Sequence, residues 1–220
     1  MVSKLEFLKS LAIARVYGFK EYEKALQFIK LNYSVTLEGK EAERILNEVL
    51  PQIKNDEFKE NKLSENYKIV YVFEKDENDK ISQQLNDLQQ YIDGVDFLDL
   101  RVSEDFYNNI VTFVVVHGLT SYDGGFGLSE RLEKSINIQA DSFFVISSEN
   151  YKTIQIHKNL NNFITEQRKI IKFMVLITLF TNKKIKSNGA PRDVKGFVRR
   201  FMRTHGIDEL KVYGRKSKGP

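Results

Sequence analysis

The chain has 220 residues, of which 41% are hydrophobic and 29% charged, enough for one sizeable domain or two small ones with a packed core. It contains no cysteine, which excludes disulfides, cysteine nucleophiles and thiolate metal sites. Its three histidines, His117, His157 and His205, lie far apart in the sequence without the close spacing typical of zinc ligands. We therefore expect no metal and no cofactor.

The net charge of +4 hides an asymmetry along the chain. Residues 168–220 hold 15 Lys and Arg against 3 Asp and Glu, so their charge is 15 − 3 = +12. The remaining residues hold 19 basic and 27 acidic side chains, which gives −8. A mildly acidic body with a basic C-terminal segment raises the question of an anionic partner.

The N-terminal residues show no secretory signal, because they lack a continuous apolar stretch and a small-residue cleavage site. The longest apolar run, Ile170–Phe180, is broken by Lys172 and Thr178 and has about half of the ~20 residues that a membrane span needs. We therefore expect a soluble protein, cytoplasmic as the sequence is written.

Residues 1–54 are expected to form a helical segment. Apolar residues at three- and four-residue steps predict helices over 4–17, 22–31 and 38–53, with Gly18 and Pro51 as stop signals. The first two resemble one tetratricopeptide unit, which cannot bury its own face alone. Two interpretations stay open: the last repeat of a longer array, or a plain helical hairpin. A charged linker, 55–66, follows.

Residues 66–166 are expected to form an α+β domain. The predicted order is β-α-β-β-α-β, the ferredoxin-like pattern with helices on one face of an antiparallel sheet. The elements are strands at 67–73, 96–102 and 110–119, helices at 78–93 and 128–136, and a strand or strand pair at 141–147 and 151–157. The apolar run Val114–Val116 favours a central position for its strand.

Several residues of this domain bear on catalysis. The glycine-rich stretch Asp123–Ser129 is interpreted as a crossover loop with Ser129 as helix N-cap, since its spacing matches no nucleotide-binding fingerprint. His117 ends a strand, and no sequence neighbour stands in a triad relation to it. Asp93, Asp96 and Asp99, like Glu104 and Asp105, are interpreted as turn residues. We predict that the protein is not an enzyme.

The stretch 147–163 combines a polar turn, an alternating strand and an Asn-rich helix start. Two interpretations stay open, an ordinary edge strand with its connections or a surface strand offered to a partner protein.

Lys68–Phe73, Phe113–Leu119 and Phe143–Leu160 together resemble the C-terminal region of the SprE/PorW family. These are tetratricopeptide lipoproteins of the gliding-motility and type IX secretion machinery of Bacteroidetes. Tyr22–Ile29 and Gly39–Leu46 are similar to the end of that family's helical array. The resemblance covers roughly residues 5–165 and implies an assembly role on the periplasmic side of the cell envelope, without active-site residues.

The sequence departs from that family in two respects. It shows neither the family's lipoprotein signal nor its long repeat array, so a fragment, a truncated product or a relative with another use is expected. The tail after Gln167 has no counterpart in the family.

The basic tail, 167–220, is predicted to hold a helix at 193–205 and a basic end. Clustered Lys and Arg side chains can bind the phosphates of nucleic acid or an anionic surface. The tail residues that could do so are Lys183, Lys184, Lys186, Arg192, Lys195, Arg199, Arg200, Arg203, Arg215 and Lys216. A solvated cationic end without a ligand is the other interpretation.

The sequence thus predicts a non-catalytic protein-interaction component of an envelope assembly. The alternative is a nucleic-acid-binding protein that acts through the tail.

Overall fold

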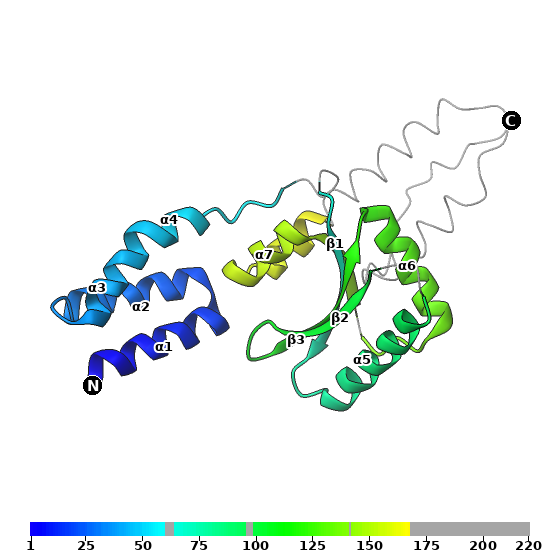
Figure 1. Ribbon diagram of the computed structural model, residues 1–220, viewed down its shortest axis with the longest axis horizontal. Coiled ribbons are helices and arrows are strands. Elements are labelled where there is room, and N and C mark those ends of the chain that lie inside the picture. The colour runs from blue at the N-terminus through cyan, green and yellow to red at the C-terminus, as the bar shows by residue number, and fades with distance from the viewer. Residues whose placement is uncertain (60–63, 96–98, 141, 168–220) are drawn as a thin grey trace, which may run out of the picture. The chain divides into compact units, whose positions relative to one another are not determined.

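A computed structural model describes residues 1–59, 64–95, 99–140 and 142–167 (Figure 1). All of them except Gln167 belong to one compact unit, Met1–Glu166. The fold is α+β: helices come first, and a four-stranded antiparallel sheet with further helices follows. The predicted tail helix and the ten basic residues named above lie outside the described residues.

The helical segment contains the predicted helices. Its elements are α1 (Val2–Tyr17), α2 (Phe19–Asn32), α3 (Leu37–Arg44), the π-helical segment η1 (Ile45–Val49) and α4 (Leu50–Ile53). Gly18 alone separates α1 from α2 and has φ +81°, and a Cβ there would lie 2.7 Å from the carbonyl oxygen of Ile156. This position therefore requires glycine.

The helical run from α3 to α4 continues through Pro51, which the sequence predicts as a stop signal. Proline removes one helical hydrogen bond and crowds the preceding turn. In η1 the chain widens directly before the proline, since the amide of Leu50 bonds to the carbonyl oxygen of Ile45. The wider π turn thus accommodates the proline two residues before the helix ends.

The sheet region follows the predicted order β-α-β-β-α-β. Its elements are β1 (Tyr67–Glu74), α5 (Asn78–Asp93), β2 (Arg101–Phe106), β3 (Val111–Leu119), α6 (Tyr122–Ser135), β4 (Ser142–Ser147) and α7 (Ser148–His157). The strands lie in the order β2-β3-β1-β4, and every neighbouring pair is antiparallel. As Val114–Val116 predicts, β3 is a central strand that is buried on both faces.

Helices cover both faces of the sheet (Figure 1). On one face Tyr71 and Phe73 pack in a core with buried residues of α5 and α6. On the other face Val70 and Phe113 pack with Tyr151 and Ile154 of α7. The expectation of helices on one face alone is therefore wrong, because α7 occupies the second face.

The helix α7 replaces the strand predicted at 151–157. The alternation of Thr153, Ile154, Gln155 and Ile156 imitates a strand. Ser147 ends β4 instead, since its Oγ accepts a hydrogen bond from the amide of Asn150 (3.2 Å) and so caps a helix.

The glycine-rich stretch is part of a helix rather than a loop. The cap of α6 is Ser121, whose Oγ accepts a hydrogen bond from the amide of Gly124 (3.1 Å), so Ser129 is not the N-cap. Gly125 explains one of the glycines, because a Cβ there would lie 2.7 Å from Cγ1 of Val145. Close helix–sheet contact thus requires a residue without a side chain.

The second predicted strand is displaced along the chain. Of its predicted residues, 96–98 lie outside the description, and β2 begins at Arg101 and includes Glu104 and Asp105. These two carboxylates are therefore strand residues. The turn follows at Asn108, whose side-chain oxygen accepts the amides of Ile110 and Val111 (both 2.8 Å).

Candidate interaction surface

Exposed apolar side chains are concentrated in the helical segment. Among the described residues, twelve large hydrophobic side chains are exposed, and eleven of them belong to residues 1–53. They are Met1, Val2, Leu5, Leu8, Leu11, Tyr17, Phe28, Leu31, Val35, Leu37 and Val49, and the twelfth is Ile110. Exposed apolar side chains mark interaction sites where they lie next to one another on one face.

The outer face of α1 is the most regular part of this surface. Leu5, Leu8 and Leu11 recur at three-residue steps and are 53%, 54% and 45% exposed. The inner face instead buries Ser3 and Ser10. An amphipathic helix normally turns its leucines inward, whereas in α1 Phe7 packs against the core of the helical segment and these leucines face outward. We call Leu5, Leu8 and Leu11 the α1 face.

The two buried serines of α1 have hydrogen-bond partners, one of them in another helix. The Ser3 hydroxyl donates to Oε2 of Glu38 in α3 (2.9 Å), and the Ser10 hydroxyl donates to the carbonyl oxygen of Phe7 (2.7 Å). Buried hydroxyls with hydrogen-bond partners cost little. The Ser3–Glu38 bond therefore joins this side of α1 to α3, whereas the Ser10 bond lies within α1.

One side of α2 is covered by α3, although Phe28 and Leu31 of α2 stay exposed. Leu26 and Ile29 of α2 are buried against Ala42 of α3, and Ile45 and Leu46 pack beside them. An ion pair between Lys30 of α2 and Glu43 of α3 (3.0 Å) joins the edges of the two helices. Helix α3 therefore packs on one side of α2, while the leucines of the α1 face stay uncovered among the described residues.

The flanks of the α1 face are basic. α1 contains Lys4, Lys9 and Arg15 against one acidic residue, Glu6, so its charge is 3 − 1 = +2. Glu6 pairs with Lys9 at 2.7 Å on the surface, and such exposed pairs contribute little stability. Since Arg15 lies over the Phe106 ring of β2 (4.9 Å), Lys4 and Lys9 are the cations of α1 that a partner on the leucines would meet.

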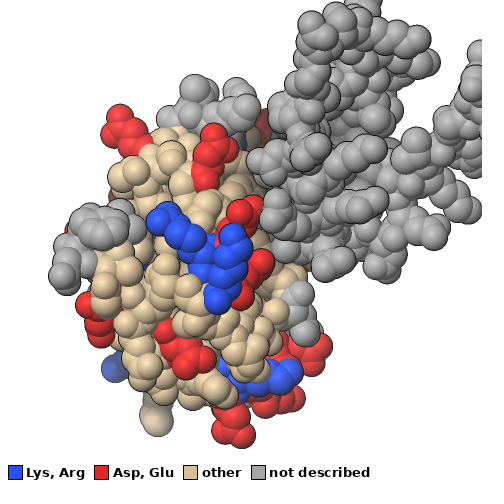
Figure 2. Space-filling model, turned by 90° about the vertical axis from the view of Figure 1, so that its right-hand side faces the viewer, with Lys and Arg blue, Asp and Glu red and all other residues tan. Residues whose placement is uncertain are grey.

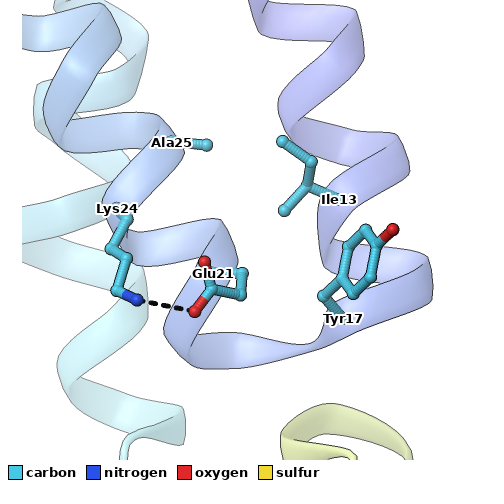
Figure 3. A pocket seen from close by; sticks show the side chains of 5 residues that line it. All are labelled: Ile13, Tyr17, Glu21, Lys24 and Ala25. Atoms are coloured by element: carbon cyan, nitrogen blue, oxygen red, sulfur yellow. Dashed lines mark hydrogen bonds and ion pairs between the residues drawn. The ribbon is translucent and has the colours of Figure 1, made fainter.

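A shallow hollow of about 700 Å³ lies between α1 and α2 (Figure 3). Ile13 and Tyr17 of α1 face Glu21, Lys24 and Ala25 of α2 across it, and Lys24 pairs with Glu21 at 2.6 Å. Its lining is apolar apart from this ion pair and the Tyr17 hydroxyl. The arrangement suits contact with apolar side chains better than acid–base chemistry.

A second feature, a polar network, lies on the face of the sheet that α7 covers. Near the first residue of β1 the pairing between β1 and β3 shifts by one residue. Two residues of β3, His117 and Gly118, therefore lie opposite the single residue Lys68 of β1. Gly118 has φ +92°, and a Cβ there would lie 2.0 Å from the carbonyl oxygen of Asp99. This β-bulge places the His117 ring beside Lys68, with Nζ and Nδ1 at 3.0 Å.

His117 also lies beside a serine, although its sequence neighbours predict none. Its Nε2 lies 2.7 Å from Oγ of Ser103, which donates to Oδ1 of Asp105 (2.7 Å). A catalytic triad needs the carboxylate on the far nitrogen of the histidine, where it orients the ring. Here Lys68 occupies that place and Asp105 bonds to the serine, so the arrangement differs from a nucleophile–base–acid relay.

The electrostatics of this network favour neutral imidazole. Burial, Lys68 and Arg101 lower the pKa of His117, while Asp105 opposes them. Burial also lowers the pKa of Lys68. Burial and the hydrogen bond to Asp105 raise the pKa of Tyr151, which keeps its hydroxyl protonated as a donor.

The other histidines serve elsewhere or lie outside the description. His157 packs against Phe19 of α2, with ring centroids 5.1 Å apart, and thereby joins α7 to the helical segment. His205 lies outside the described residues. Within the part of the chain that the structure describes, no group of three or more His, Asp or Glu side chains could hold a metal ion.

The face that includes α5 and α6 carries charges of both signs. In Figure 2 the basic side chains have acidic neighbours over this face. The described residues there therefore form no extended cationic surface of the kind that follows a nucleic-acid backbone.

Sequence reasoning missed Ser103, Asp105 and Tyr151 as members of the network. Arg101, Ser103 and Asp105 alternate along one strand and therefore share a face. This alternation is the feature of the sequence from which their position on one face of the strand can be predicted. The bulge and the helical state of Tyr151 depend on contacts between distant residues, which the sequence pattern does not reveal.

No helix among the described residues combines the length and apolar character needed to cross a bilayer. Comparisons of the chain with protein-family models, with curated proteins and with solved structures find no match.

Proposed function

We propose that this protein is a non-catalytic interaction component that docks onto a partner through the α1 face. The observation that carries the proposal is the regular exposed row of Leu5, Leu8 and Leu11 on α1, which with its N-cap holds six of the twelve exposed large hydrophobic side chains among the described residues. Burying three leucines that are half exposed would contribute roughly 1 kcal/mol each to binding, from about 25 cal/mol per Å² of apolar surface.

The proposed occupant of the α1 face is a pair of helices with an apolar face and acidic edges. The packing of α3 on α2 is the internal precedent, because it joins a small residue, Ala42, to the buried Leu26 and Ile29 and adds the Lys30–Glu43 pair at the edge. Lys4 and Lys9 of α1 complement acidic residues on such a partner. A second copy of the chain would instead bring two cationic helices together.

The sheet region acts in this proposal as the support of the helical segment. The β-α-β-β-α-β order and the strand order β2-β3-β1-β4 favour a ferredoxin-like domain, to which α7 is added. Through Ile156 and His157, α7 contacts the core of the helical segment. The sheet region thereby supports the helical segment that carries the α1 face.

From the resemblance to the SprE/PorW family, the partner is proposed to belong to a cell-envelope assembly of the gliding and type IX secretion type. Tyr22–Ile29 and Gly39–Leu46 resemble the end of the family's helical array, and a helical pair on the α1 face fits that arrangement. The assembly, its compartment and the absence of catalysis are part of the proposal.

Photo-crosslinking from the α1 face tests the proposal. A photoreactive p-benzoylphenylalanine replaces Leu8 in the full chain, expressed in a gliding member of the Bacteroidetes, and cross-linked peptides are sequenced by mass spectrometry. We expect cross-links to an apolar helical peptide with flanking Asp or Glu from an envelope protein. The same residue in place of Gln90, exposed on α5, is the matched control.

Two outcomes would contradict the proposal. One is equal cross-linking from positions 8 and 90, and the other is cross-linking of position 8 to lipid or nucleic acid instead of protein. Cross-links between two copies of α1 would contradict the proposed occupant and favour self-association.

A further inference from the structure

The polar network forms a continuous path of hydrogen bonds across the sheet. Its first half joins three strands: Lys68 of β1 contacts Nδ1 of His117 in β3 (3.0 Å), and Nε2 of His117 contacts Oγ of Ser103 in β2 (2.7 Å). The Ser103 hydroxyl then donates to Oδ1 of Asp105 (2.7 Å). All four side chains are partly buried.

The second half joins the same carboxylate to α7. The Tyr151 hydroxyl donates to Oδ2 of Asp105 (2.5 Å), Nε2 of Gln155 donates to the Tyr151 oxygen (3.1 Å), and Nζ of Lys158 donates to Oε1 of Gln155 (3.1 Å). The Lys158 ammonium also lies 4.8 Å from the centre of the Tyr107 ring. Asp105 is thus the acceptor on which both halves converge.

The chemistry of the donors fixes the state of His117. A lysine ammonium only donates, so Nδ1 of His117 must be the unprotonated acceptor, and the ring proton must be on Nε2. That proton is donated to Ser103, whose own proton goes to Asp105. Every donor in the path therefore points toward Asp105, and the path is complete only while His117 is neutral.

We propose that His117 is a proton-operated latch at the bulged end of the sheet. Neutral His117 bridges β1 to β2 across the bulge, where the register of the strands is interrupted. A second proton on His117 would occupy Nδ1, place two donors against each other, and break the contact with Lys68. This inference does not depend on the proposed docking partner.

The groups that face His117 decide the sign of the effect. Lys68 from β1 and Arg101 from β2 oppose a positive imidazolium, as does burial, whereas Asp105 from β2 favours it. Asp105 is already bonded to Ser103 and to Tyr151 of α7, so its charge is partly engaged. Burial and the two cations therefore outweigh the carboxylate, and the folded state lowers the pKa of His117.

The consequence for stability follows from proton linkage. The unfolded chain binds a proton at the ordinary pKa of histidine, about 6.5, before the folded chain does. The stabilisation from neutral His117 is therefore present above about pH 6.5 and is lost as the pH falls through the lowered folded value. Acidification therefore breaks the contact between His117 and Lys68.

Nuclear magnetic resonance titration of the full chain tests the latch. We expect the His117 ring to titrate below the ordinary range, and the amides of β2 to exchange faster with solvent as it gains its proton. After correction for intrinsic exchange, the ratio of β2 rates to α5 rates should rise about tenfold for each unit by which the pKa of His117 is lowered.

Two variants test the roles of His117 and Lys68 separately. In His117→Gln the amide can still accept from Lys68 and donate to Ser103 but cannot titrate, so the pH-dependent rise in β2 exchange should disappear. In Lys68→Met the opposing ammonium is removed while an apolar stem remains, so the pKa of His117 should rise. An unchanged pKa in Lys68→Met, or a β2 exchange ratio that does not respond to His117 protonation, would overturn the latch.

Discussion

Single residues determine where this backbone can depart from regular geometry. Gly118 carries the bulge that brings His117 to Lys68, and its φ of +92° belongs to the region that favours glycine. The carbonyl oxygen of Asp99 also leaves no room for a Cβ. Steric exclusion and backbone strain therefore act at the same position.

Replacement of Gly118 by alanine should lower the free energy of unfolding by about 2 kcal/mol or more, because strain and a backbone clash add. Gly127→Ala is the matched control, since this position lies inside α6 with nothing within 4 Å of a Cβ. Alanine there should stabilise by about 0.5–1 kcal/mol. Urea unfolding measures both, and equal effects would contradict the assigned role of Gly118.

Lys158 is a charged residue held in an unfavourable environment. It ends α7 in the left-handed conformation with φ +53°, and burial together with Arg15 lowers its pKa to about 8. Because the folded state disfavours the ammonium, the unfolded chain binds this proton more readily between about pH 8 and the ordinary lysine value.

Wild-type protein should therefore gain stability relative to a Lys158→Met variant as the pH rises from 7 to 10. The comparison between the two proteins cancels contributions from the tyrosines and carboxylates that they share. Denaturant unfolding at a series of pH values measures the difference. A stability difference that stays constant, or moves in the opposite direction, would contradict the perturbed ammonium.

At the scale of elements, α1 and α2 use their apolar residues in opposite ways. Leu26 of α2 is fully buried, at 0% exposure, whereas Leu8 of α1 is half exposed. The same residue type thus stabilises the fold in one helix and is available for contact in the other. Their substitution should separate folding from binding.

Leu8→Glu should change the free energy of unfolding by less than about 0.5 kcal/mol, since the side chain is exposed and glutamate is a good helix former. Leu26→Ala should cost about 2–5 kcal/mol, because it leaves a cavity in a packed core. Thermal or urea unfolding distinguishes them. A large loss of stability in Leu8→Glu would mean that the α1 face contributes to the core.

The sequence predicts the regular elements of the sheet region well where one period dominates. The helix expected at 78–93 is α5 with the same bounds, and the strands expected near 67–73 and 110–119 are β1 and β3. Prediction from the sequence fails where one segment carries the patterns of two different kinds of element. Alternating Thr153–Ile156 conceals the helix α7, and Gly124, Gly125 and Gly127 conceal the first turns of α6.

The candidate sites were harder to predict because they depend on orientation. The spacing of Leu5, Leu8 and Leu11 predicts a helix but does not tell which side of it faces the core. That choice depends on contacts with other helices, such as the bond from Ser3 to Glu38 of α3 and the packing of Phe7 against the core of the segment. The network of His117 likewise joins β1, β2, β3 and α7, which are separated along the chain.

At the scale of the whole molecule, the described unit places exposed apolar surface in its helical segment and buries it in its sheet region. The sheet faces are covered by α5 and α6 on one side and by α7 on the other. Ile110 is the one large hydrophobic residue outside residues 1–53 that is exposed among the described residues. This distribution separates a supporting region from a contacting one.

Cysteine protection tests this separation most directly, because the natural chain has no cysteine to interfere. Leu8→Cys and Ile110→Cys, at positions 54% and 69% exposed, report on the two regions. In the purified protein we expect a maleimide to alkylate both readily. In envelope assemblies isolated from cells, position 8 should be protected while position 110 stays reactive. Equal reactivity at the two positions in those assemblies would contradict docking through α1.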